Sequence, residues 1–145
     1  MTYTDEYWMK EALKEAHKAN EKGEVPVGAV VVCSDRVIAR AHNLTETLND
    51  VTAHAEMQAI TSAANAIGGK YLNECTLYVT LEPCIMCAGA LFWSQINRVV
   101  YGASDPKRGY STSNVTMHPK TSITSNIMAE ESAVLLRDFF KQKRT

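Results

Sequence analysis

The chain has 145 residues, of which 46% are hydrophobic and 21% are charged. This composition is that of a globular protein and excludes an intrinsically disordered chain. The net charge of −1 excludes a strongly basic protein that coats nucleic acid, but it leaves room for a local basic patch. The length predicts a single domain over residues 1–145. No apolar run is long enough to span a membrane, and the charged start is unlike a secretory signal, so we expect a cytoplasmic protein with no membrane partner.

The first half of the chain alternates between helical and strand patterns. Apolar residues recur at helical spacing over residues 5–22, which predicts a helix. Two β-branched runs, residues 27–33 and 37–42, are separated by a Ser-Asp pair and predict two antiparallel strands. We expect Gly28 to allow close packing on the first of these strands. After a polar loop, a second helix is predicted over residues 53–67.

The second half supplies the remaining strands. Short buried strands are predicted over residues 76–80 and 98–103, and a compact apolar segment over residues 84–93 lies between them. A polar, irregular stretch leads to a weak strand over residues 121–127 and a last helix over residues 129–143. Helices that alternate with short buried strands are typical of a three-layer α/β/α domain, here with a central mixed five-stranded sheet.

Two short motifs contain the residue types that bind zinc in proteins. His54 begins a His-Ala-Glu sequence, and Cys84 and Cys87 form a Cys-x-x-Cys pair directly after Pro83. On the first turn of a helix, residues three apart face the same way, and the helix N-terminus favours thiolates. One imidazole and two thiolates leave the fourth position of a tetrahedral zinc ion for water, as hydrolysis requires.

Glu56 is the acidic residue of the first motif. Two residues apart on a helix means a rotation of roughly 200°, so Glu56 does not point alongside His54 and is not expected to be a metal ligand. Beside an activated water, a carboxylate can instead take a proton and pass it to the substrate. An H-x-E motif followed by P-C-x-x-C is the signature of zinc deaminases. We therefore predict hydrolytic deamination with Glu56 as the proton shuttle.

The cysteine pair has two other interpretations. A redox pair explains Cys84 and Cys87 but gives His54 and Glu56 no role. A structural zinc needs a fourth protein ligand. The candidates for that ligand are His17, His42, His118, Cys33 and Cys75. The last two fall in or beside apolar strands, where a buried thiol is an ordinary core residue. A catalytic zinc is the interpretation that uses every residue of the two motifs.

Longer stretches of the chain resemble the cytidine/deoxycytidylate deaminase superfamily, and within it the bacterial enzymes that act on adenosine in tRNA. The similar stretches are EVPVGAVVV (24–32), TAHAEMQAI (52–60), TLYVTLEPCIMCAGAL (76–91), RVVYGASDPKRG (98–109), MHP (117–119) and EESAVLLRDFFKQKR (130–144). Together they cover most of the chain. The resemblance implies a cytidine-deaminase-like fold and the conversion of adenosine to inosine at the wobble position of tRNA anticodons. It also implies that His54, Cys84 and Cys87 bind one Zn²⁺ per subunit, and that Glu56 is catalytic.

The resemblance implies substrate contacts as well. Asn43, by sequence alone a loop residue, corresponds to an asparagine that hydrogen-bonds the target purine. Asp105 and Lys107 lie in the loop that touches the neighbouring nucleotides in the family. The implied partners are a tRNA anticodon stem-loop and a second copy of the chain in a homodimer. Basic residues that could form an RNA-binding face are Lys107, Arg108, Lys120, Arg137, Lys141, Lys143 and Arg144.

Two other functions remain open at this point. A free-nucleobase deaminase that acts on guanine or cytosine has the same zinc motifs, whereas a basic last helix and the loop over residues 104–120 favour RNA. A non-catalytic RNA-binding subunit is expected to lack the proton shuttle, which is present here as Glu56. The chain departs from the family pattern at residues 92–95 and 108–113. Both segments lie outside the zinc motifs.

Overall fold

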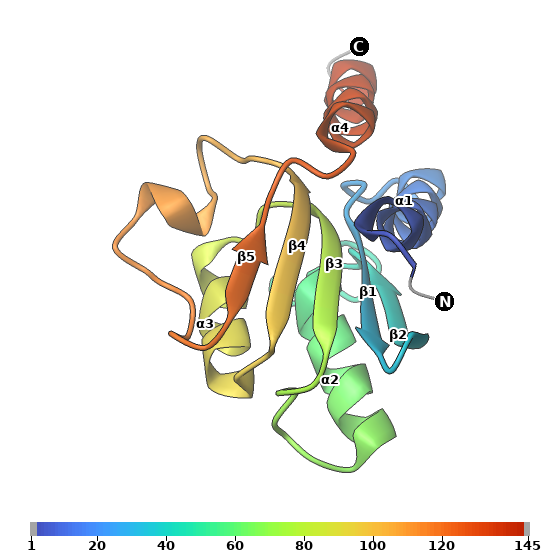
Figure 1. Cartoon of the computed structure of the whole chain (residues 1–145). Helices are drawn as coiled ribbons and strands as arrows, with labels where there is room; N and C mark the ends of the chain where they lie inside the picture. The colour runs from blue at the N-terminus through green and yellow to red at the C-terminus, as the bar shows by residue number, and fades with distance from the viewer. Residues whose placement is uncertain (1–2, 144–145) are drawn as a thin grey trace.

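A mixed β-sheet forms the centre of the computed structural model, which describes residues 3–143 (Figure 1). Its strands are β1 (Gly28–Cys33), β2 (Arg36–His42), β3 (Thr76–Leu81), β4 (Arg98–Ala103) and β5 (Ser122–Thr124). Within the described residues the strand order is β2-β1-β3-β4-β5. β1 is antiparallel to β2 and β3, whereas β4 is parallel to β3 and β5. The predicted mixed five-stranded sheet is confirmed.

The helices cover both faces of this sheet. They are α1 (Asp5–Glu21), α2 (Ala55–Ile67), α3 (Ile85–Ser94) and α4 (Ala129–Lys143), with a short 3₁₀ helix η1 (Tyr110–Thr112). α1 and α4 pack on one face, and α2 and α3 pack side by side on the other (Figure 1). This is the predicted α/β/α layering. No helix in residues 3–143 is long and apolar enough to cross a membrane.

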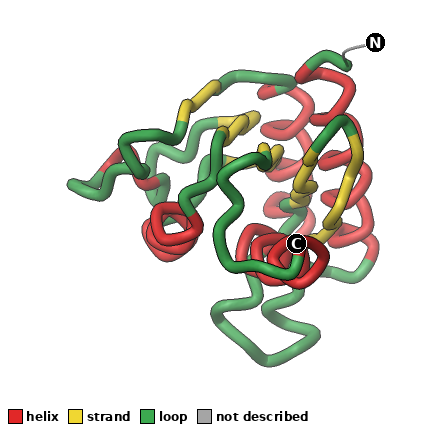
Figure 2. The backbone as a smooth tube through the Cα atoms, turned by 60° about the horizontal axis from the view of Figure 1, so that its bottom comes forward, coloured by secondary structure: helices red, strands yellow, loops and turns green. Residues whose placement is uncertain are grey.

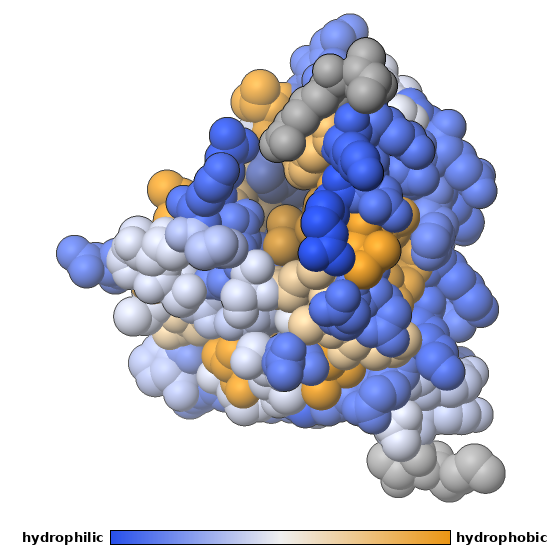
Figure 3. All heavy atoms as spheres, turned by 90° about the horizontal axis from the view of Figure 1, so that it is seen from above, coloured by the Kyte–Doolittle hydropathy of each residue, from blue (hydrophilic) through white to orange (hydrophobic). Residues whose placement is uncertain are grey.

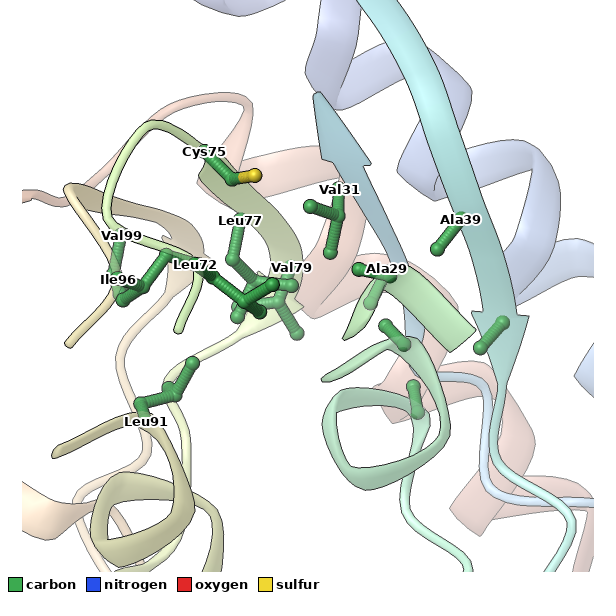
Figure 4. Packing of buried hydrophobic residues seen from close by; sticks show 14 of the residues in the cluster. Ala29, Val31, Ala39, Leu72, Cys75, Leu77, Val79, Leu91, Ile96 and Val99 are labelled. Carbon is green, nitrogen blue, oxygen red and sulfur yellow. The ribbon is translucent and has the colours of Figure 1, made fainter. Parts of the chain in front are cut away.

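The larger hydrophobic core lies between the sheet and the α2–α3 layer (Figure 4). Ala55, Ala59 and Ala63 recur every four residues along α2 and are fully buried. Side chains this small let the helix axis approach Ala29 and Val31 of β1 closely. The start of α2 is thereby held close to the sheet.

A second core lies on the opposite face, beneath α1. Val30 and Val32 of β1 point into it, because successive strand residues alternate between the two faces of a sheet. Gly28 lies directly against α1, where a Cβ atom would collide with the backbone of Ala12 and Ala16. The predicted role of Gly28 in close packing is therefore explained by the α1 backbone.

Two predicted boundaries differ from the structure by two residues or more. α2 begins at Ala55 and not at residue 53, because the residues before it form a turn in which the Ala53 amide donates to the Asp50 carbonyl at 3.1 Å. The last strand ends at Thr124, short of the predicted residue 127. Asn126 and Met128 adopt left-handed backbone angles, with φ of 66° and 55°, which extended strands do not accommodate.

The segment between β4 and β5 is irregular, as predicted, apart from η1. It extends away from the sheet before returning to β5 (Figure 1), and the tube view shows it mainly as loop (Figure 2). Seen from the end at which α4 lies, the surface is mostly hydrophilic with separate hydrophobic patches (Figure 3).

The contact between Gly28 and α1 generates a stability prediction. Gly28→Ala should lower the free energy of unfolding by about 1–3 kcal/mol, because the added methyl group forces α1 away from β1. The measurement is urea denaturation followed by circular dichroism. Gly69→Ala is the matched control, since a Cβ at Gly69 meets no atom within 4 Å. It should change stability by less than about 0.5 kcal/mol. Equal stability of the two variants would contradict the packing argument.

Candidate metal and catalytic site

Three predicted residues meet where α2 and α3 begin. His54 Nδ1 lies 3.6 Å from Cys84 Sγ and 3.5 Å from Cys87 Sγ. One ligand atom from each residue lies within 4.8 Å of the other two, so the group can hold a metal ion. Cys87 is buried, whereas His54 and Cys84 are partly exposed. The structure thus brings the two sequence motifs together at one point that solvent can reach.

Two helix N-termini position these side chains. His54 is the N-cap residue of α2 and Cys84 is the N-cap residue of α3, and neither side chain forms a capping hydrogen bond. Ser, Thr, Asp or Asn usually occupies this position and caps the helix with its side chain. The imidazole and the thiol are free of that role and point toward each other. Cys87 follows on the first turn of α3, as predicted from its spacing.

The charges of the two thiols are coupled. The pKa of Cys84 is lowered to about 4, chiefly because the Cys87 thiol donates a hydrogen bond to it, with His54 adding to the effect. The same contact, together with burial, raises the pKa of Cys87. The hydrogen bond with Cys84 also raises the pKa of His54. In this arrangement the two sulfurs share one proton, and a bound cation allows both to ionise.

The ligand atoms fit a zinc ion. With the usual Zn–S and Zn–N bond lengths in a tetrahedral shell, a sulfur and a nitrogen ligand are about 3.6 Å apart. The two measured sulfur–nitrogen separations are 3.5 and 3.6 Å. A His/Cys/Cys donor set is also one that zinc prefers. Geometry and donor chemistry therefore agree.

Glu56 lies beside this group, on the first turn of α2. Its side chain is almost fully buried, with 4% exposed, and contacts the Cys87 thiol. Burial raises the pKa of Glu56 to about 7. A carboxyl group with a pKa near neutrality can both accept and release a proton at physiological pH. The arrangement therefore places a carboxyl group that is able to transfer protons next to the three candidate metal ligands.

Asn43 lies at the end of β2, where the loop that leads to His54 begins. Its amide nitrogen donates to the Val25 carbonyl at 3.3 Å, and its Oδ1 accepts from the Thr45 amide at 3.2 Å. The loop closes on itself, because the Leu44 amide donates to the carbonyl of the residue before His54 at 3.0 Å. The chain thus returns from Asn43 to the metal ligands.

The loop after β4 contains Asp105 and Lys107 and lies at the same end of the sheet as Asn43. Asp105 Oδ1 accepts from the backbone amides of Lys107 and Arg108 at 3.1 and 3.0 Å, which fixes the turn. Further along the loop, Gly109 forms a β-bridge with Cys84. The structure therefore places this loop against the start of α3.

The other candidate zinc ligands lie apart from this group. Within residues 3–143, the cluster that can hold a metal contains none of the five additional histidines and cysteines. Cys75 is buried, which raises its pKa to about 12, and it belongs to the core. With no fourth protein ligand, a structural zinc is disfavoured, and one position of a tetrahedral shell is left for water.

Two buried acids were not predicted from the sequence. Glu24 is 1% exposed and accepts hydrogen bonds from Glu46 and Thr47. Glu82 is 3% exposed and accepts hydrogen bonds from Asp105 and Ser111. Each acid therefore holds a loop that adjoins the site. An acidic residue next to an apolar strand and a proline is the signal that could have identified them.

The basic residues are spread over two elements. Those on the loop after β4 are Lys107, Arg108 and Lys120, and those on α4 are Arg137, Lys141 and Lys143. Arg137 lies 3.8 Å from Glu130. Arg144 lies outside the described residues. That these residues form a single basic face remains a prediction.

The fold and the site define a class of protein. Residues 2–103 match the family model described as the cytidine and deoxycytidylate deaminase zinc-binding region. Because this match covers most of the chain, the protein belongs to the cytidine and deoxycytidylate deaminase family.

The chain is similar to more specific relatives along nearly its whole length. It is 49% identical to the tRNA-specific adenosine deaminase of Bacillus subtilis, over 97% of this chain and 91% of the relative. A solved structure from studies of A-to-I editing by tRNA:A34 deaminases is 45% identical, with a TM-score of 0.83, and the match covers 90% of this chain and 99% of that chain. The guanine deaminase of Bacillus subtilis is 38% identical, with a TM-score of 0.67, over 70% of this chain and 66% of that chain.

The geometry of the ligand group predicts the effect of removing one thiol. Cys84→Ser should reduce bound zinc from about one ion per chain to a small fraction of that, because a hydroxyl is a poor replacement for a thiolate ligand. The measurement is metal analysis of purified protein. Cys75→Ser changes a thiol outside the group and should retain the metal. Loss of zinc in both variants, or in neither, would contradict the assignment.

Proposed function

We propose that this protein converts adenosine to inosine by hydrolytic deamination at the wobble position of tRNA anticodons. The observation that carries the reaction is the buried Glu56 beside His54, Cys84 and Cys87. Near full-length similarity to tRNA-specific adenosine deaminases supports the substrate. In this proposal residues 1–145 act as one deaminase domain in the cytoplasm, where tRNA is available.

The four residues of the site have separate roles. His54, Cys84 and Cys87 hold one Zn²⁺ per subunit, which when bound supplies Lewis-acid activation of water for attack on the purine. The Glu56 carboxylate accepts the proton released from the water and delivers it to the substrate, so that ammonia leaves and inosine remains. Burial gives Glu56 the near-neutral pKa that suits both accepting and releasing a proton.

The two loops beside the site supply the substrate contacts. Asn43 positions the target purine, and Asp105 and Lys107 contact the neighbouring nucleotides. Because bases in a single-stranded loop are already unpaired, moving one of them into a pocket costs little free energy. An anticodon loop therefore suits a site that lies beside two polar protein loops.

The exposed face of α3 supports a homodimer. Ile85 is 55% exposed and Trp93 is 77% exposed, and Gly89 lies midway between them, at a spacing of four residues. A Cβ at Gly89 would meet no atom within 4 Å, so the face between the two large side chains is open. The exposure of Trp93 excludes it from the hydrophobic core of the subunit. We propose that a second copy of the chain covers this face and that both subunits contact the anticodon stem-loop.

The reaction and the substrate can be tested together. Glu56→Gln should lower the rate of inosine formation roughly 10²- to 10⁴-fold, because the amide cannot transfer the proton. It should retain zinc, since Glu56 is not among the ligand atoms. The assay incubates zinc-loaded protein with an anticodon stem-loop that carries adenosine at the wobble position and detects inosine by mass spectrometry.

Free guanine and cytosine are tested in parallel. Turnover of a free base with the RNA unchanged would contradict the tRNA substrate but retain the assigned roles at the zinc site. This arm is needed because a guanine deaminase is among the similar structures. Full activity of Glu56→Gln on any substrate would contradict the role of Glu56.

The dimer is tested by placing a charge on α3. Trp93→Glu should convert a particle of about twice the 16.0 kDa chain mass into a monomer, because an isologous contact buries both copies of this side chain. Light scattering coupled to size exclusion measures the mass. Val134→Glu places the same charge at an exposed apolar residue of α4, on the opposite face of the sheet, and should remain dimeric. A monomeric wild type would refute the interface.

A further inference from the structure

We propose that Glu82 is a positioning residue that fixes the loop over residues 104–112 beside the site and so controls how RNA is held. Its carboxylate is buried at the end of β3, two residues before Cys84. The part of this inference that concerns RNA rests on the proposed function. The part that concerns the loop rests on hydrogen bonds alone.

Both oxygens of Glu82 are directed at this loop. Oε1 accepts from the backbone amide of Asp105 at 3.0 Å. Oε2 accepts from the backbone amide of Ser111 at 3.0 Å and from its hydroxyl at 2.6 Å. These donors lie at the two ends of the turn that contains Lys107. One carboxylate therefore closes a segment of seven residues, and hydrogen bonds to a charged group are among the stronger ones in proteins.

The middle of the loop is shaped to fit this carboxylate. A Cβ at Gly109 would collide with the carboxyl group of Glu82, so the backbone approaches the acid as closely as a residue without a side chain allows. The Tyr110 amide donates to the Pro83 carbonyl at 2.9 Å, and Gly109 forms a bridge with Cys84. The loop is thus attached to the residues that immediately precede α3.

This attachment affects the catalytic site only by fixing where the loop lies relative to it. Pro83 and Cys84 follow Glu82 in the chain, so a displaced loop also frees the bridge to a predicted metal ligand. The exposed Lys107 and Arg108 lie between the two anchor points. When the loop is released, the positions of these two charged side chains relative to the site are no longer fixed.

The experiment uses Glu82→Gln in the full-length, zinc-loaded protein. The carboxamide keeps the size of the side chain, but its amino group cannot accept a hydrogen bond, so one anchor point is lost. Trypsin should then cut after Lys107 and Arg108 roughly tenfold faster than in the wild type, because loop opening becomes more favourable. Cleavage after Lys70, in an exposed loop elsewhere, is the internal reference and should be unchanged.

Two further variants separate loop attachment from general instability. Gly109→Ala leaves the acid intact but pushes the loop away, and it should accelerate the same cleavage. Glu24→Gln removes a comparable buried carboxylate that holds the other loop through Thr47, and it should leave cleavage after Lys107 unchanged. If Glu82→Gln and Gly109→Ala are both cut at the wild-type rate, the proposal is wrong.

Kinetics on the anticodon stem-loop test the functional part. Glu82→Gln should raise KM roughly tenfold and change kcat less than about twofold, because the chemical groups are intact and the RNA contacts are loosened. A fall in kcat with KM unchanged would overturn the positioning role. If the wild type does not deaminate the RNA, the proposed function fails, and the trypsin result alone decides whether Glu82 holds the loop.

Discussion

The constraint on which the site depends is the meeting of two helix N-termini on one face of the sheet. α2 and α3 pack side by side, and small side chains hold α2 close to β1. The first residues of the two helices therefore lie next to each other, with His54 and Cys84 at the N-cap positions. Helix N-termini favour negative charge, which suits thiolates. The same packing that forms the hydrophobic core thus brings the three candidate metal ligands together.

The pKa values of two buried acids near the site shift in opposite directions. Glu56 and Glu24 are both almost inaccessible to solvent. For Glu56 burial dominates and raises the pKa to about 7. For Glu24 burial also acts to raise the pKa, but hydrogen bonds from Thr47 and Glu46 outweigh it and the pKa is lowered. Hydrogen bonds from the surrounding donors therefore decide in which direction the pKa of each of these buried carboxylates shifts.

The sequence predicts interactions that depend on near neighbours or on a recognised pair of motifs, and it misses other interactions between distant segments. The shared orientation of Cys84 and Cys87 could be predicted, because residues three apart lie on the same side of one helical turn. The early start assigned to α2 is wrong because the turn at Asp50 keeps His54 outside the helix. The hydrogen-bond partners of Glu82 could not be assigned, since they lie 23 and 29 residues away. Such contacts are set by the register of β3 and β4, which a linear pattern does not contain.

The metal-binding motifs carry the reaction but do not determine the substrate. A tRNA:A34 deaminase and a guanine deaminase both resemble this chain in structure. We infer that discrimination comes from what surrounds the ligand group, and the two loops proposed to contact the substrate are the one that begins at Asn43 and the one held by Glu82. A small base needs an enclosed pocket, whereas an RNA loop needs an entrance that accepts flanking nucleotides. Two separately anchored loops suit the second requirement, because each is tied to the backbone next to a helix N-terminus of the site and carries its own polar side chains.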